Sequence, residues 1–384
     1  MKKIIILGSC GSIGTQTLDI LSETNSDFKI EAISIGRDLD LARNIIKKYS
    51  PNLVCARTKE HKEILENEFN NKFVYGDEGL IEVACYKKEE EILLVSALVG
   101  SAGLKPTVEA IKIKRNIALA NKETLVMAGD IVMDLARKKN VKILPLDSEH
   151  SAIWQCLSGE KINEVKKMII TASGGALRDI CLDELENVSL EQVLNHPNWS
   201  MGKKITVDSA TMMNKGFEVI EAHHLFNIDY KKIETIMHKE SIIHSMVEFV
   251  DGQIKAQIGP HNMKLPIIYA INYPNRVSTN VESLDFVKMK SLNFKELSFE
   301  RFNCLRLAYL AGEKGNIYPT VLNAANEACV ELFLNNKIKF CMIDKIIESY
   351  VTTYNTIDNI TIEKIIEVDN QIKKEIFDKY GDEK

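Results

Sequence analysis

Residues 3–14 read Lys3-Ile4-Ile5-Ile6-Leu7-Gly8-Ser9-Cys10-Gly11-Ser12-Ile13-Gly14, and this stretch decides the fold. The apolar, β-branched run up to Leu7 is typical of a buried strand, and apolar residues at helical spacing follow in residues 15–21. The glycines between them let the backbone turn tightly and approach a pyrophosphate, which rests on the N–H groups that open a helix. The spacing is G-x-x-G-x-x-G and departs from the usual G-x-G-x-x-G. We therefore favour a dinucleotide site here and keep a structural turn as the alternative.

A second apolar run, residues 28–35, ends in Gly36-Arg37-Asp38. A site for NAD places a carboxylate near this strand end, on the ribose 2′-hydroxyl, whereas a guanidinium suits the 2′-phosphate of NADP. Arg37 therefore favours NADP. Asp38 and Asp40 nearby keep NAD as an alternative. A second alternative is that Arg37 is simply solvated and binds no cofactor.

Short apolar runs and polar helical segments continue to alternate as far as residue 146. Helical segments at 58–69 and 125–138 lie between strand-like runs, and this order predicts a parallel, doubly wound sheet. The strand-like runs are residues 53–56, 73–75, 92–98, 117–120 and 141–146.

Composition narrows the class of protein. The chain has 384 residues, of which 45% are hydrophobic and 27% charged, so it can bury two or three cores. A formal charge of −5, without a basic cluster that interleaves aromatics, argues against nucleic acid. The first apolar run is too short for a signal peptide or a membrane span, and eight scattered cysteines suit a reducing cytoplasm.

The last apolar run ends in Asp147-Ser148-Glu149-His150. In extended chain, residues i and i+2 point the same way, so the carboxylates of Asp147 and Glu149 are expected side by side at a strand end. Carboxylate oxygens favour a hard cation such as Mg²⁺ or Mn²⁺, and Glu218 is the candidate third ligand. The alternative is an acidic loop that caps the following helix.

Two shorter motifs lie at ends of predicted strands. Lys122, in Asn121-Lys122-Glu123, is placed to bind a substrate oxygen, but Glu123 equally suits a helix cap, and from these residues alone the structural reading is preferred. Ser173-Gly174-Gly175 ends a small-residue loop of the kind that wraps an anion in backbone N–H groups.

Residues 208–218 gather a hydroxyl, an amide, an ammonium and a carboxylate. If this segment is helical from Thr211, Asn214 and Glu218 share one face with Lys215 beside them, so a phosphate and a metal are both within reach. The preceding residues 196–202 contain a proline and a glycine and expose Trp199, as a mobile lid would. An ordinary loop with Trp199 in the core is the alternative.

The patterns in the remainder of the chain predict secondary structure and no catalytic or binding residues. Residues 241–250 and 253–258 alternate around Asp251-Gly252 as a β-hairpin does, and a helix is expected at 260–269. Residues 274–301 lack sustained periodicity and are expected to be a connector. Helical patterns in residues 302–334, 343–354 and 362–380 predict a terminal bundle.

Seven motifs, in this order, resemble the 1-deoxy-D-xylulose 5-phosphate reductoisomerase family, and together they are far more specific than any one of them. They span the chain from the first strand to the terminal helices. The motifs are GSCGSIG (8–14), ANKE (120–123), LDSEH (146–150), SGG (173–175), HPNWSMG (196–202), NKGFE (214–218) and LNAANE (322–327).

This resemblance implies an oxidoreductase and isomerase of the non-mevalonate isoprenoid pathway. Such an enzyme uses NADPH and a divalent metal, Mg²⁺ or Mn²⁺, to rearrange 1-deoxy-D-xylulose 5-phosphate and reduce it to 2-C-methyl-D-erythritol 4-phosphate. A cytoplasmic homodimer without nucleic-acid or membrane partners is expected. The implied organisation is an α/β chain with a Rossmann-like NADPH domain (1–146), a central α/β catalytic and dimerisation domain (147–273, flap 195–205), a connector (274–301) and a C-terminal helical bundle (302–384).

Carried over residue by residue, the resemblance assigns Asp147, Glu149 and Glu218 to the metal, and these three with Lys122 to catalysis. Substrate would also contact Ser148, and the closing flap would contribute His196, Trp199 and Met201. The phosphate would be held by Ser173, Ser209, Asn214 and Lys215. The cofactor would lie along Gly8, Ser9, Cys10, Gly11, Ser12 and Ile13, with Gly36, Arg37, Asp38, Asn121, Glu123 and Gly202 also around it.

Two positions depart from the family pattern, and two other functions compete with it. Cys10 stands where threonine is common, so a hydroxyl donor to the cofactor is lost, and Ala176 stands where proline commonly follows Gly175. A simple NADP-dependent dehydrogenase of another phosphorylated substrate would turn over without metal. A non-catalytic nucleotide-binding scaffold would bind NADPH without turning over any sugar phosphate.

Overall fold

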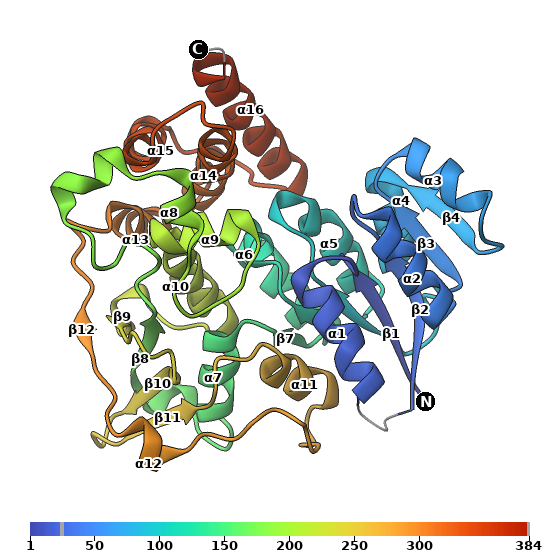
Figure 1. Ribbon diagram of the computed structural model, residues 1–384, viewed down its shortest axis with the longest axis horizontal. Coiled ribbons are helices and arrows are strands. Elements are labelled where there is room, and N and C mark those ends of the chain that lie inside the picture. Colours follow the sequence, from blue (N-terminus) through green and yellow to red (C-terminus); the bar gives the residue numbers. More distant parts are fainter. Residues whose placement is uncertain (24–26, 382–384) are drawn as a thin grey trace. The chain divides into compact units, whose positions relative to one another are not determined.

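A computed structural model describes residues 1–23 and 27–381 (Figure 1). The described chain forms two compact units, and neither of them is continuous in sequence. The polypeptide twice leaves the first unit and returns to it, for residues 125–129 and again after residue 151. The first unit comprises Met1–Thr124, Asp130–Ser151 and Asn262–Val281, and the second comprises Leu125–Gly129, Ala152–His261 and Glu282–Lys384.

The first unit is built on a sheet whose strands lie in the order β4-β3-β2-β1-β5-β6-β7. All neighbouring strands run parallel, which confirms the predicted Rossmann-like sheet. The order reverses at β1, and open α/β sheets bind ligands beyond the carboxyl ends of the strands at such a point. The strands are β1 (Lys2–Leu7), β2 (Phe28–Ser34), β3 (Leu53–Ala56), β4 (Lys72–Tyr75), β5 (Leu93–Ser96), β6 (Ile117–Leu119) and β7 (Ile143–Pro145).

Burial explains why these short runs are strands. Ile4, Ile5, Ile6 and Leu7 of β1 are fully buried, because the strand has neighbours on both edges and side chains on both faces. A strand buried on both faces reads as a continuous apolar run and not as an alternation. Each such side chain stabilises the fold by about 1.5–3 kcal/mol relative to an exposed one. The core of this unit therefore fixes the glycine loop that follows β1.

Helices connect the strands of the first unit. The predicted helix at 125–138 begins earlier, at Lys122, and Ala128 interrupts its helical geometry (φ −139°, ψ 25°). Residues 125–129 of that helix belong to the second unit. The helices are α1 (Ser12–Glu23), α2 (Leu39–Tyr49), α3 (Lys59–Glu66), α4 (Gly76–Ala84), α5 (Leu104–Lys112), α6 (Lys122–Lys139) and α11 (Lys264–Asn272).

Helix α11 belongs to the first unit although it follows much of the second in sequence. It packs against α1 and β7. It begins at Lys264, four residues later than the predicted start at residue 260, because Asn262 Oδ1 accepts a hydrogen bond from the Lys264 backbone N–H (2.9 Å) and closes a turn there. The division into units thus differs from the expected boundaries at residues 146 and 273.

The second unit contains a mixed sheet in the order β11-β10-β8-β9-β12. The antiparallel pairing of β10 with β11 confirms the predicted hairpin. The expected connector is more ordered than its sequence indicates, because a two-residue strand in it pairs with β9. The elements are β8 (Val165–Ala172), β9 (Ile233–Met237), β10 (Ile243–Phe249), β11 (Ile254–Ile258), β12 (Lys295–Glu296) and α12 (Phe286–Met289).

Helices make up the rest of this unit, and the predicted C-terminal bundle is present (Figure 1). The periodic stretch 302–334 is two helices, since Gly315 adopts a positive φ (59°) after α13 and Pro319 lies in the first turn of α14. The helices are α7 (Ser148–Cys156, shared with the first unit), α8 (Leu190–Leu194), α9 (Lys203–Ala210), α10 (Met213–Phe226), α13 (Asn303–Lys314), α14 (Tyr318–Leu334), α15 (Ile343–Thr353) and α16 (Ile362–Tyr380).

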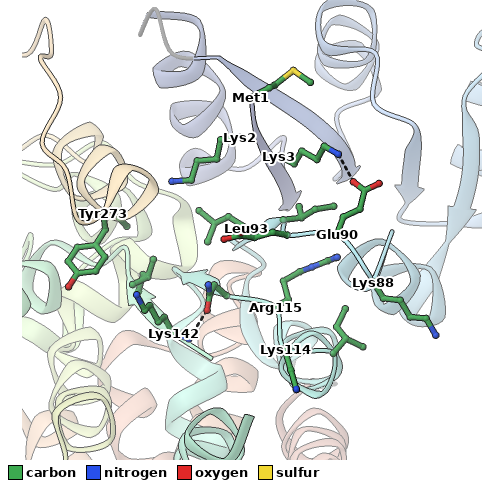
Figure 2. Close-up of a pocket in the computed structure, with 16 residues that line it drawn as sticks. Met1, Lys2, Lys3, Lys88, Glu90, Leu93, Lys114, Arg115, Lys142 and Tyr273 are labelled. Carbon is green, nitrogen blue, oxygen red and sulfur yellow. Dashed lines mark hydrogen bonds and ion pairs between the residues drawn. The ribbon is translucent and has the colours of Figure 1, made fainter. Parts of the chain in front are cut away.

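A cavity of about 630 Å³ opens at the amino-terminal edge of the parallel sheet, the edge opposite the glycine loop (Figure 2). Two of the basic side chains that line the cavity make contacts within the protein. Arg115 is 3% exposed and donates to the carbonyls of Ala84 (2.6 Å) and Tyr86 (2.8 Å) at the end of α4, while Lys3 pairs with Glu90 (2.6 Å). These cations stabilise a helix end and a strand, as basic side chains at helix C-termini do.

Within residues 1–23 and 27–381, none of the helices has the length and apolar character needed to cross a membrane.

Candidate active site

The glycine loop brings the end of β1 and the start of α1 into close contact. Gly8 has a φ of +85°, and a Cβ there would lie 2.5 Å from the Ala97 carbonyl oxygen. A Cβ on Gly14 would lie 2.2 Å from the Gly8 carbonyl oxygen, so a side chain at either position would force the backbone apart. The loop therefore presents the first N–H groups of α1, which have no partner inside the helix, beyond the end of β1.

Neighbouring strand ends hold this loop in place. The Gly8 N–H donates to Ser34 Oγ (2.8 Å), and the buried Ser9 hydroxyl donates to the Ser34 carbonyl (2.9 Å). Cys10 lies beside the end of β2. A Cβ built on Gly36 would be 3.8 Å from the Cβ of Cys10. Burial raises the pKa of the Cys10 thiol, so the thiol stays protonated at neutral pH. The predicted cofactor residues 8–13 and 36 thus lie together.

The charged side chains that follow β2 differ in their contacts. Asp38 is the N-cap of α2, and its Oδ1 accepts from the Leu41 backbone N–H (2.9 Å). Asp40 pairs with Arg43 (2.8 Å). Both acidic groups that kept NAD as an alternative therefore serve local structure. Arg37, which directly precedes Asp38, is exposed at the strand end and remains the cation suited to a 2′-phosphate.

Asn121 joins the loops that follow β5 and β6. It is buried, and its side-chain amide donates to the carbonyls of Leu98 and Gly100 and to Glu123 Oε2, each at 2.9 Å. Among the described residues these contacts already use the amide protons of Asn121. Asn121 therefore holds the two loops together, and the role at the cofactor predicted for Asn121 and Glu123 stays a prediction.

The acidic motif after β7 has a different geometry from the one expected. Helix α7 begins at Ser148, so Asp147 and Glu149 do not alternate along an extended strand. Asp147 Oδ1 accepts from the Glu149 backbone N–H (3.0 Å), and this confirms the capping alternative for Asp147. The prediction of a strand at this point was wrong because Asp and Ser, which suit a metal site, are also good residues to begin a helix.

The charges of this motif are nevertheless gathered within the first unit. The Lys122 ammonium forms an ion pair with Asp147, and the Ser148 hydroxyl contacts the Glu149 carboxylate. The fully buried His150 has its Nδ1 3.5 Å from Asp147 Oδ1. The structure therefore brings together four residues that were predicted to contact metal or substrate: Lys122, Asp147, Ser148 and Glu149.

A second group of predicted residues lies in the second unit. Ser173 follows β8, and Gly174 and Gly175 both adopt positive φ (88° and 72°). A Cβ on Gly175 would lie 2.5 Å from the Ser209 carbonyl oxygen at the end of α9. Because Gly175 has no side chain, the small-residue loop can lie directly against the segment that carries Ser209. The two predicted phosphate elements are thus in contact.

His196 links the predicted flap to this loop. Its Nδ1 accepts hydrogen bonds from the backbone N–H groups of Asn198 (3.2 Å) and Trp199 (3.0 Å), and its Nε2 is 3.1 Å from Ser173 Oγ. This network assigns the ring proton to Nε2, which donates to Ser173. Burial, with a contribution from the Arg178 charge, lowers the pKa of His196 to about 4, so the ring is neutral. The Ser173 hydroxyl proton can then point to another acceptor.

Helix α10 carries the remaining predicted residues, and the expected helical face is confirmed. Asn214 Nδ2 donates to Glu218 Oε1 (2.6 Å), and the Lys215 ammonium pairs with Glu218 Oε2. Glu218 is 1% exposed and Lys215 is 4% exposed, so the buried carboxylate is neutralised by its neighbour on the helix. Met212, just before the helix, has a left-handed backbone (φ 62°), which is strain of the kind found at functional sites.

Two residues near the flap were not predicted. The Arg178 guanidinium donates to the Ser173 carbonyl (2.7 Å), and Asn198 Nδ2 donates to the Lys239 carbonyl (2.6 Å). Trp199 packs edge-on against the ring of His261 (centroids 5.7 Å apart) and is therefore half-buried and not exposed as a lid residue was expected to be. Asn198 lay inside a quoted motif, whereas no sequence signal indicated Arg178.

Family models match the chain in three places. Residues 4–129 match the model described as 1-deoxy-D-xylulose 5-phosphate reductoisomerase, residues 143–226 match its C-terminal domain, and residues 258–375 match a further DXP reductoisomerase C-terminal domain. Curated proteins named 1-deoxy-D-xylulose 5-phosphate reductoisomerase are similar over nearly their whole length. The one from Clostridium perfringens is 48% identical (99% of this chain, 100% of that protein), and the one from a Geobacillus strain is 50% identical (97% and 98%).

Solved structures give the same result. A DOX-P reductoisomerase in complex with NADPH, fosmidomycin and magnesium superposes with a TM-score of 0.92 at 36% identity and covers 99% of this chain and 98% of that one. The 1-deoxy-D-xylulose 5-phosphate reductoisomerase of Zymomonas mobilis in complex with NADPH has a TM-score of 0.90 at 36% identity, with 99% of each chain covered.

Proposed function

The chain belongs to the 1-deoxy-D-xylulose 5-phosphate reductoisomerase family, and we propose that the two residue groups described above together carry out the family's reaction. The enzyme rearranges 1-deoxy-D-xylulose 5-phosphate and reduces it with NADPH to 2-C-methyl-D-erythritol 4-phosphate. The observation that carries this conclusion is the match to curated reductoisomerases over the full length of the chain. The assignment of roles to individual residues is our proposal.

NADPH fits the edge of the first unit that carries the glycine loop. We propose that residues 8–13 hold its pyrophosphate on the first N–H groups of α1, where the helix dipole favours an anion. Arg37 binds the 2′-phosphate, because the nearby carboxylates are used in capping and in an ion pair. Gly36 leaves space beside Cys10 for the adenosine end. Asp38, Asn121, Glu123 and Gly202 complete the proposed surroundings of the cofactor.

A divalent cation fits the donor chemistry of Asp147, Glu149 and Glu218. All three offer carboxylate oxygens, which suit Mg²⁺ and also Mn²⁺. Asp147 and Glu218 each have an ammonium group beside them, and this contact orients each carboxylate. When bound, the cation would polarise the oxygens of the substrate and stabilise the negative charge that develops on oxygen.

Lys122 and Ser148 act beside this group. The Lys122 ammonium already orients Asp147 and is a cation that can stabilise a developing oxyanion beside it. The Ser148 hydroxyl contacts Glu149 and can donate to a substrate oxygen instead. We propose that both contact the substrate at the end where its carbon–carbon bond is rearranged.

The phosphate is bound by the second group. Ser173, Ser209, Asn214 and Lys215 supply hydroxyl, amide and ammonium donors from two segments that touch at Gly175. The phosphate is remote from the bonds that change, so its contacts can supply binding energy for closure and orientation. His196, Trp199 and Met201 belong to the segment that closes, and the proposed flap 195–205 includes the first turn of α9.

A cytoplasmic homodimer is part of the proposal. The edge strand β11 leaves Ile254 and Ile258 52% and 40% exposed, and Val250 at the hairpin is 67% exposed. An exposed edge strand with apolar side chains is a surface that a second copy can cover. In solution we expect twice the mass of one chain by light scattering. A monomer at micromolar concentration would refute the dimer without affecting the proposed reaction.

One assay separates the proposal from its two competitors. NADPH oxidation is followed with 1-deoxy-D-xylulose 5-phosphate after chelation of metal, and again after Mg²⁺ or Mn²⁺ is returned. We expect oxidation only with metal present. Turnover without metal would favour a simple dehydrogenase, and NADPH binding without any turnover would favour a nucleotide-binding scaffold.

A further inference from the structure

The sequence motif at residues 322–327 has no task in the reaction as proposed, yet it contains two fully buried asparagines. Both lie in α14, within the C-terminal helices. Burying a side-chain amide costs free energy unless the amide is hydrogen-bonded. Asn326 Nδ2 donates to Asp208 Oδ1 in α9 at 2.8 Å, so its bond joins two helices that are distant in sequence.

Asp208 stands at the centre of this connection. Its side chain is 3% exposed, and its second oxygen, Oδ2, lies 3.0 Å from the Lys204 ammonium. Lys204 is in the first turn of α9, at the end of the proposed flap 195–205. The carboxylate of Asp208 therefore links the root of the flap to the C-terminal helices through two charge-assisted contacts.

The next residue along the chain is the phosphate ligand Ser209. Its carbonyl oxygen is the atom that the backbone at Gly175 approaches, so a small shift of the last turn of α9 would open the contact between the two phosphate segments. Thr211 Oγ1 donates to the Asp208 carbonyl (3.2 Å) and ties the same turn to the strained residue Met212. The position of Asp208 thus sets the position of Ser209.

We propose that Asn326 is a positioning residue for the phosphate site: through Asp208 it holds the last turn of α9 so that Ser209 and the loop at Ser173 meet the same phosphate group. The C-terminal helices then contribute to substrate affinity without touching the substrate. This inference rests on the proposed binding of phosphate by Ser173 and Ser209.

Two matched substitutions test it. Asn326→Asp keeps the shape of the side chain, removes its donor and places a second carboxylate beside Asp208. Asn323→Asp makes the same change one turn earlier in α14, at an equally buried residue whose amide donates to Glu327 of its own helix (3.1 Å). The first measurement is the affinity for inorganic phosphate by isothermal titration calorimetry. The second is KM and kcat for the sugar phosphate.

We expect Asn326→Asp to weaken phosphate binding and to raise KM, each by about tenfold, with a smaller change in kcat. Asn323→Asp should change the phosphate affinity by less than about twofold, since the hydrogen bond of the Asn323 amide stays within α14. The double variant Asp208→Asn with Asn326→Asp restores an amide–carboxylate pair with the roles exchanged. It should recover most of the lost affinity.

Equal losses in the two single variants would overturn the inference, because a merely structural role of the buried amides predicts them. Wild-type affinity in Asn326→Asp, or absence of phosphate binding to the wild-type protein, would also overturn it. Failure of the wild-type enzyme to oxidise NADPH with the sugar phosphate would instead count against the proposed function, and the calorimetry would still decide the role of Asn326.

Discussion

Glu149 is the residue at which a single change should separate chemistry from cofactor binding. Glu149→Gln keeps the size of the side chain and removes the charge proposed to hold the metal. We expect kcat to fall by roughly 100-fold or more, while NADPH affinity changes little because the glycine loop is untouched. Steady-state kinetics and NADPH fluorescence check the two halves. A variant with unchanged turnover and metal dependence would remove Glu149 from the site.

Arg37 should determine the choice of cofactor. In Arg37→Ala we expect the preference for NADPH over NADH, measured as the ratio of kcat/KM values, to fall by about tenfold or more, because a charge-assisted contact to the 2′-phosphate is lost. Arg43→Ala is the matched control, since that arginine of α2 already pairs with Asp40 and Glu68. If the ratio of kcat/KM values fell equally in both variants, the cause would be the loss of a nearby positive charge and not of a specific contact between Arg37 and the 2′-phosphate.

The lowered pKa of His196 predicts that the folding stability of the protein depends on pH. Its pKa is about 4 in the folded protein, where the ring is buried, and near 6.5 in an unfolded chain. Between these values the unfolded state binds more protons, so the stability that neutral His196 provides is complete above about pH 6.5 and declines as the pH falls toward 4. We expect the difference in Tm between wild type and His196→Asn to shrink from about pH 7 to about pH 5. A difference that stays constant with pH would contradict the lowered pKa.

At the level of single residues, contacts set by helical spacing were easier to predict than backbone conformation. Asp147 was predicted as a ligand in extended chain, but it begins a helix, because the same carboxylate serves either role. Arg178 could not be predicted, since no motif surrounds it and its contact with the Ser173 carbonyl exists only in the folded chain. The pairing of Asn214, Lys215 and Glu218 was predictable because helical spacing alone brings them together.

At the level of elements, the loop at Gly175 offers the sharpest test. Gly175→Ala would place a Cβ 2.5 Å from a backbone oxygen of α9 in a left-handed conformation that alanine avoids. We expect KM for the sugar phosphate to rise by at least about tenfold with little effect on NADPH affinity. Gly159→Ala is the control, because it also has a positive φ (82°) but nothing within 4 Å of its Cβ. A similar KM in both variants would contradict the close approach.

Strands were the elements that the sequence predicted best. Short apolar runs such as residues 53–56 are typical of buried strands, and that run is β3 with the predicted bounds. The boundaries of helices were less predictable, since the start of α11 depends on a turn at Asn262 and the break after α13 on Gly315. Strand β12 has only two residues, too few for any periodicity to show.

At the level of the whole molecule, the division into units could not be predicted. Helix α11 joins the first unit because its apolar side packs on α1 and β7, and no composition change at residue 262 marks that return. The family resemblance nevertheless extended along the entire chain. Most of the motifs lie at carboxyl ends of strands or in first turns of helices, where a fold can present polar groups at little cost to its core, whereas LNAANE is buried inside α14.

The central claim is that carboxylates from separate parts of the chain share one divalent cation. The most direct measurement is the number of Mn²⁺ ions bound per chain, counted by electron paramagnetic resonance with NADPH and the sugar phosphate present, in wild type, Glu149→Gln and Glu218→Gln. We predict one ion per chain in the wild type and a large loss of affinity in both variants. Full Mn²⁺ affinity in either variant would show that these carboxylates do not hold the same ion.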